Sequence, residues 1–131
     1  MRTSFFLSLL ILSIVSPLSL LAQQGRWELL GSRRVNYGLD RDEIPVTVRE
    51  GFFDALQLRV RGGSVQFHKV VVHYGNGQTD EIELRAVIPS GGQSRVIDLP
   101  GNNRVITKVV FYYDTQGIRR GKASVNLWGR H

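Results

Sequence analysis

The sequence predicts an all-β protein, an antiparallel sandwich of jelly-roll type or a small barrel, with about seven to eight strands. Apolar and polar residues alternate with a period of two over most of the chain after residue 24, whereas a helical period is hard to find. Fourteen glycines and clusters of turn residues separate the alternating runs. A length of 131 residues suits one domain, and the lack of cysteine excludes disulfides and thiolate metal sites.

Residues 1–22 have the pattern of a secretory signal peptide. Arg2 supplies a positive charge, an apolar run follows, and Pro17 precedes Ala22 and a polar start. An uncleaved anchor is the alternative, but a span needs about 20 apolar residues, and this stretch contains serines and a proline. We therefore expect cleavage after Ala22, a single domain over residues 23–131, and export to the periplasm or the cell exterior without a membrane span in the mature chain.

The expected strands follow one another between short turns. A first strand opens the domain, two short alternating strands come next, a long hairpin follows, and three further strands close the chain. In order, these strands cover residues 27–35, 44–48, 56–60, 65–74, 78–87, 97–99, 104–113 and 125–127. The predicted core is Ile44, Val46, Leu56, Leu58, Val60, Val70, Val72, Ile82, Leu84, Ile97, Leu99, Val109, Phe111, Val125 and Leu127. Residues 36–43 and 114–122 are expected as the longest polar loops, where binding residues are often found.

The Asn76-Gly77 pair predicts the turn of the long hairpin. A two-residue loop would place Val71 opposite Ile82, whereas a three-residue loop would place Val70 there. The second register gathers apolar side chains on one face and charged ones on the other, so we prefer it. A change in the parity of the apolar positions also predicts a β-bulge near His68-Lys69.

Five stretches of the expected mature chain carry a resemblance to known sequences. They are Asp40-Arg41-Asp42-x-Ile44-x-Val46, Phe53-x-x-Leu56-x-Leu58-x-Val60, Val70-x-Val72-x-Tyr74-Gly75-Asn76-Gly77, Ser94-Arg95-x-Ile97-Asp98-Leu99-x-Gly101-x-x-Arg104-x-Ile106 and Gly121-x-Ala123-x-Val125. With them the chain resembles a family of small exported bacterial β-sandwich proteins of uncharacterised function. The resemblance implies export and a β-sandwich, and it brings no activity, cofactor or catalytic residue with it.

The sequence holds no familiar catalytic motif, so we expect neither enzymatic activity nor a cofactor. Nucleophile elbows, zinc-protease helices and phosphate- or dinucleotide-binding loops are absent. Of the three histidines, His131 is terminal, and His68 and His73 lie on one expected strand, on opposite faces unless a bulge intervenes. We expect His73 to form a solvated pair with Glu81.

Asp40, Asp42 and Glu43 form the densest acidic cluster and could offer oxygen ligands to calcium. We favour the alternative that the two aspartates accept hydrogen bonds from nearby backbone N–H groups and that the intervening arginine pairs with one of them. No metal site is therefore predicted. Further along the chain, Asp98 and Arg104 are expected to form an ion pair across a hairpin loop.

Two kinds of residue are candidates for binding. Arginine dominates the basic residues, and loss of Arg2 would lower the net charge from +6 to +5. Basic clusters could hold an anionic envelope polymer, and two tryptophans, brought close if the first and last strands pair, could stack on a sugar. The alternatives are a solvated surface and a structural role for the aromatic rings. The candidates are Arg59, Arg61, Arg119, Arg120, Lys122, Trp27 and Trp128.

These observations predict an exported, non-catalytic protein of the cell envelope that binds a glycan, a lipid head group or an envelope protein. The alternatives are a structural or stress-related envelope protein with no small ligand, and a hydrolase without a familiar motif. Nucleic acid is not expected as the cognate partner, because the chain leaves the cytoplasm and lacks a pattern of stacking aromatic residues.

Overall fold

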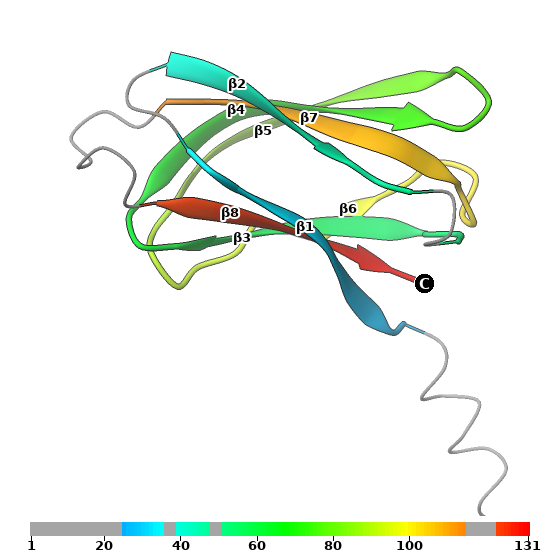
Figure 1. Cartoon of the computed structure of the whole chain (residues 1–131), viewed down its shortest axis with the longest axis horizontal. Coiled ribbons are helices and arrows are strands. Elements are labelled where there is room, and N and C mark those ends of the chain that lie inside the picture. The colour runs from blue at the N-terminus through cyan, green and yellow to red at the C-terminus, as the bar shows by residue number, and fades with distance from the viewer. Residues whose placement is uncertain (1–24, 36–38, 48–50, 115–122) are drawn as a thin grey trace, which may run out of the picture.

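The computed structural model describes residues 25–35, 39–47, 51–114 and 123–131. This part of the chain contains eight strands and no helix, and the strands form two antiparallel sheets packed face to face (Figure 1). The strands are β1 (Trp27–Arg34), β2 (Leu39–Pro45), β3 (Ala55–Arg61), β4 (Val65–Tyr74), β5 (Thr79–Ile88), β6 (Ile97–Asp98), β7 (Ile106–Asp114) and β8 (Ser124–Arg130). The predicted all-β sandwich is confirmed.

The strand order is β1-β8-β3-β6 in one sheet and β2-β7-β4-β5 in the other. In Figure 1 the first sheet forms the lower layer and the second the upper layer. The first and last strands, β1 and β8, are neighbours, as expected for a sandwich. The β2-β7-β4-β5 sheet is built from segments far apart in the sequence, so any site on it depends on long-range pairing.

The core lies between the two sheets and has the predicted composition. Of the fifteen predicted core residues, all but Ile82 are buried, and Ile82 packs partly buried against the rest. The largest fully buried side chains include three aromatic residues outside the predicted set, Phe53, Phe67 and Tyr113. The alternating strands therefore pack their apolar faces inward and leave two outer faces open to solvent.

The long hairpin has the three-residue loop. Val70 pairs with Ile82, and the amide of Gly77 donates to the carbonyl of Tyr74 at 3.1 Å. Gly77 has a φ of 87°, a left-handed conformation that glycine adopts without a steric penalty. The preferred register is confirmed, and so is the bulge, because the pairing shifts between Phe67 and Lys69.

Two expectations about the loops are wrong. Residues 39–43 belong to β2 and not to a loop, because Asp42 continues the inward face of an edge strand and accepts a hydrogen bond from Tyr113 Oη at 2.7 Å. Asp98 does not pair with Arg104. The Arg104 guanidinium lies 3.7 Å from the ring centroid of Tyr74, while Asp98 Oδ1 lies 3.5 Å from a nitrogen of Arg130.

Some expectations lie outside the described residues. These are the signal peptide at residues 1–22 and three members of the basic clusters, Arg119, Arg120 and Lys122. Within the described part of the chain, no helix is long and apolar enough to span a membrane.

Candidate functional site

A groove of about 750 Å³ crosses the outer face of the β2-β7-β4-β5 sheet. All four strands of the sheet contribute to its walls. The lining residues are Asp40, Arg41, Gln66, Phe67, His68, Lys69, Glu83, Arg85 and Tyr112. This volume lies within the range of about 300–1,000 Å³ that is usual for sites of small ligands.

The groove lies where the sheet is irregular. Between Phe67 and Lys69 the pairing of β4 shifts against both β5 and β7, which leaves His68 without a regular partner on β7. Arg85, in the β5 part of the irregularity, has a φ of 41°, which is uncommon for a residue other than glycine. A bulge bends and twists its strand and redirects side chains, and here it brings His68 to the same outer face as Lys69.

Tyr112 forms the aromatic part of the groove. Lys69 Nζ lies 4.7 Å and Arg41 Cζ 6.0 Å from the centroid of its ring, so two cations flank it. A hydrogen bond with Tyr112 is the main cause that raises the pKa of Arg41. A hydrogen bond with Glu81 is the main cause that raises the pKa of Lys69. Both basic side chains therefore stay charged at neutral pH.

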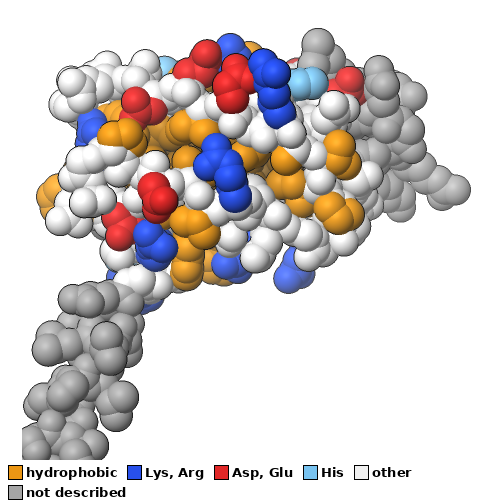
Figure 2. All heavy atoms as spheres, turned by 180° about the vertical axis from the view of Figure 1, so that it is seen from behind, with side chains coloured by type: hydrophobic (Ala, Val, Ile, Leu, Met, Phe, Trp, Pro, Cys, Tyr) orange, Lys and Arg blue, Asp and Glu red, His pale blue; other side chains and the backbone are white. Residues whose placement is uncertain are grey.

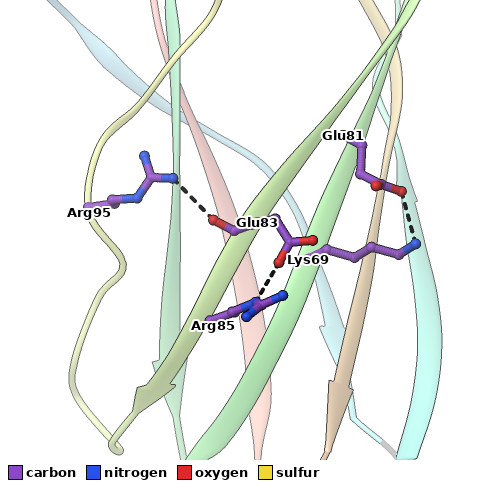
Figure 3. Close-up of polar contacts among 5 residues, drawn as sticks. All are labelled: Lys69, Glu81, Glu83, Arg85 and Arg95. Carbon is purple, nitrogen blue, oxygen red and sulfur yellow. Dashed lines mark hydrogen bonds and ion pairs between the residues drawn. The ribbon is translucent and has the colours of Figure 1, made fainter.

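Each basic side chain of the groove has a carboxylate partner. Lys69 Nζ lies 2.9 Å from Glu81 Oε1 on the neighbouring strand, and Arg85 pairs with Glu83 two residues before it (Figure 3). Arg41 pairs with Glu43 at 3.4 Å. A third arginine, Arg95, lies in the segment before β6 and donates to the backbone carbonyl of Glu83 at 3.3 Å. The groove is thus surrounded by alternating donors and acceptors.

The two tryptophans lie together on the opposite side of the sandwich. Trp27 of β1 and Trp128 of β8 face outward on adjacent strands, since Leu29 pairs with Trp128 and Trp27 with Arg130. Arg59 stacks its guanidinium 4.2 Å from the ring centroid of Trp128. Arg59 therefore covers one face of the Trp128 ring.

The two arginines of β3 have different environments. Arg59 is half-buried and its Nε donates to Gln57 at 3.2 Å, whereas Arg61 is exposed at the end of the strand. The prediction that both point outward from the sheet agrees with Leu58 and Val60 being buried. Arg59 is fixed against Trp128, so the pair does not form one open cationic surface.

The acidic cluster does not converge on a metal site. Asp42 lies on the inner face of β2 and Glu43 on the outer face, where it also faces Lys108 at 3.8 Å. Asp40 Oδ1 accepts a hydrogen bond from the backbone N–H of Arg41 at 2.7 Å, as the favoured alternative predicts, whereas Asp42 accepts from a side chain and Arg41 pairs with Glu43. Among the described residues there is no group of three potential ligands that could hold a metal ion.

Sequence reasoning missed the groove because its centre, Tyr112, lies in an uninterrupted apolar run. Alternation alone does not show which of Tyr112 and Tyr113 faces outward, because the apolar residues Val109, Val110 and Phe111 precede them. Glu81 pairs with Lys69 and not with His73, which is opposite Thr79. The predicted bulge was the one sequence signal that pointed to this place.

The chain belongs to the family described as "Domain of unknown function (DUF2541)", which matches residues 5–129. No curated protein matches the chain in sequence. Among solved structures, AlgX of Pseudomonas aeruginosa is similar over 80% of this chain, with a TM-score of 0.51 and 17% identity. The chain spans only 27% of the length of AlgX, and at this identity the likeness shows the fold alone.

Two carbohydrate-binding modules are similar at lower TM-scores. One is a family 29 module complexed with cellulohexaose, with a TM-score of 0.40, 11% identity, and coverage of 82% of this chain and 92% of that module. The other is the Clostridium perfringens module CpGH89CBM32-4, with a TM-score of 0.44, 16% identity, and coverage of 83% and 96%. Likenesses this loose describe the neighbours and carry no argument about the site of this chain.

Proposed function

We propose that this protein is a non-catalytic glycan-binding module of the cell envelope and that the groove around Tyr112 is its binding site. One observation carries the proposal: an aromatic ring on β7, in a hollow of the sheet, is surrounded by polar side chains from the other three strands. A sugar ring has an apolar C–H face and a rim of hydroxyl groups. A tyrosine ring suits the face, and convergent donors and acceptors suit the rim.

The sheet supports this role because it fixes the side chains without a ligand. Lys69 and Arg41 are each held by an ion pair and by contact with Tyr112. Side chains on the strands of a sheet keep their geometry better than side chains on loops. A ligand would therefore meet a site that is already ordered, which lowers the entropic penalty of binding.

The positions of the groove carboxylates favour binding over hydrolysis. Among the described lining residues, Asp40 lies on β2 and Glu83 on β5, at opposite edges of the sheet and about 14 Å apart by strand spacing. Each is held to its own strand, Asp40 by the Arg41 amide and Glu83 by Arg85. A glycosidase pair needs carboxyl groups about 5–9.5 Å apart. Glu81 and Glu83 lie nearer to each other on β5, but each is held in an ion pair, with Lys69 and Arg85 respectively.

Binding of the folded protein to an array of envelope and plant glycans tests the proposal. We expect a defined set of glycans to bind, Tyr112→Ala to abolish that binding, and Trp27→Ala on the other face to leave it intact. Equal loss in both variants would move the site away from the groove. Failure of every glycan would favour a structural envelope protein with no small ligand.

Export is part of the same proposal. We propose that residues 1–22 are removed and that the mature chain begins at Gln23. N-terminal sequencing of the protein from the envelope fraction of the native host checks this, and an intact Met1 would contradict it.

A further inference from the structure

We infer that the groove recognises an uncharged oligosaccharide and rejects acidic ones; this inference rests on the proposed function. The net charge of +6 would by itself suggest an anionic ligand. The groove argues otherwise, because its basic side chains are neutralised locally and the excess charge lies elsewhere on the chain.

The ion pairs around the groove balance one another. Three basic side chains that line it pair with Glu43, Glu81 and Glu83. Asp40 adds a further carboxylate to the lining. Figure 2 shows the same mixture along the upper layer, where red and blue side chains intermingle and neither sign forms a continuous field.

An acidic ligand would meet carboxylates at every basic side chain. Beside Lys69 it would approach Glu81, whose oxygen lies 2.9 Å from the ammonium nitrogen. Beside Arg41 it would approach Glu43, which is 43% exposed and faces Lys108 as well. Like charges placed together at an interface are unfavourable and serve to exclude the wrong partner.

A neutral sugar uses the same pairs without disturbing them. An ammonium group has three donors and a carboxylate has about four acceptor positions, so one ion pair leaves several of each unused. The Lys69–Glu81 pair and the Arg85–Glu83 pair thus offer a donor beside an acceptor. A hydroxyl group both donates and accepts, and neighbouring hydroxyls of a sugar match that arrangement. Tyr112 supplies the apolar surface between them.

The test compares two matched ligand panels on the full mature protein. One panel holds neutral oligosaccharides, and the other holds uronate oligosaccharides of equal length, including oligogalacturonate with its methyl-esterified form. Affinities are measured by calorimetry at about 10 mM and about 150 mM salt, where the screening length differs about fourfold. We expect binding within the neutral panel, with an affinity that changes less than twofold with salt.

Glu81→Gln separates the electrostatic claim from the site itself. We expect it to weaken neutral ligands about tenfold, the loss that one hydrogen bond to a charged group supports. We expect the same variant to increase the affinity for uronates. Asp98→Asn is the matched control, because it removes the same charge on the other sheet, 83% exposed beside Arg130, and it should change neither affinity.

These experiments distinguish failure of the neutral-ligand inference from failure of the proposed glycan-binding function. Tight, salt-dependent binding of uronates that Tyr112→Ala abolishes would overturn the present inference and leave the glycan-binding function standing. No binding in either panel would overturn both. Binding that neither Tyr112→Ala nor Glu81→Gln alters would also overturn both, because the ligand would then lie outside the groove.

Discussion

Replacement of Gly129 by alanine tests the packing that holds the β1-β8-β3-β6 sheet together. Gly129 lies on the central strand β8, with β1 and β3 on either side. A Cβ atom there would lie 2.7 Å from Phe53 Cδ1 and 2.8 Å from Leu30 Cδ1. Carbon atoms pack best at about 3.5–4.0 Å, so the neighbours must move by about 1 Å.

The clash falls on a side chain with little freedom. Phe53 is fully buried, and its ring centroid lies 4.5 Å from that of His131. Overpacking of this kind costs about 1–3 kcal/mol. For a domain of this size each kcal/mol lowers Tm by about 4 °C, so Gly129→Ala should lower Tm by about 4–12 °C in calorimetry.

A second substitution identifies the clashing partner. Phe53→Leu removes the ring atoms that the new methyl group would meet, so the double variant should be more stable than the sum of the two single effects by more than about 0.5 kcal/mol. An unchanged Tm in Gly129→Ala would refute the close approach. Strict additivity would refute Phe53 as its cause. Affinity for a groove ligand should be unchanged below Tm, because Gly129 belongs to the other sheet.

Three further predictions concern the core, the cation–π stack and a buried phenol. Leu58→Ala should cost about 2–5 kcal/mol in urea unfolding, because Leu58 is fully buried, and an effect within error would refute that packing. Arg59→Ala should lose about 0.5–1 kcal/mol with its ring contact, whereas the exposed Arg61→Ala should lose nothing; equal losses would contradict the stack. Burial and the hydrogen bond to Asp80 raise the pKa of Tyr74, so the protonated phenol stabilises the fold below about pH 10, and this contribution falls as pH rises further. Thermal melts should show a steeper loss above pH 10 in the parent than in Tyr74→Phe.

The sequence predicted the elements whose faces differ in polarity. The hairpin register follows from Val70 and Ile82 sharing a face that excludes Lys69, because the other register would mix apolar and charged residues. The same contrast predicted the core and the bulge. These are local patterns, in which the polarity of each residue indicates whether its side chain is buried or exposed.

The sequence could not predict features that depend on partners far along the chain. β2 looked like a loop because it carries Asp40 and Asp42, and the inward Asp42 is satisfied by the hydroxyl of Tyr113, 71 residues away. The groove forms because Arg41 on β2 and the bulged strand β4 lie on either side of Tyr112 on β7. Strand order decides these contacts, and alternation carries no information about strand order.

The arginines explain why the net charge does not describe the surface that the protein offers to a ligand. The net charge counts every guanidinium alike, but the structure uses most of those it describes in internal contacts. Arg104 stacks on Tyr74, Arg59 stacks on Trp128, and Arg130 forms an ion pair with Asp54 at 2.8 Å. A stacked or paired guanidinium already has its charge partly compensated, so the basic composition predicts weak, salt-sensitive association with polyanions. Selective recognition then has to come from a place where paired charges and an aromatic ring are already arranged, and the groove of the β2-β7-β4-β5 sheet is such a place.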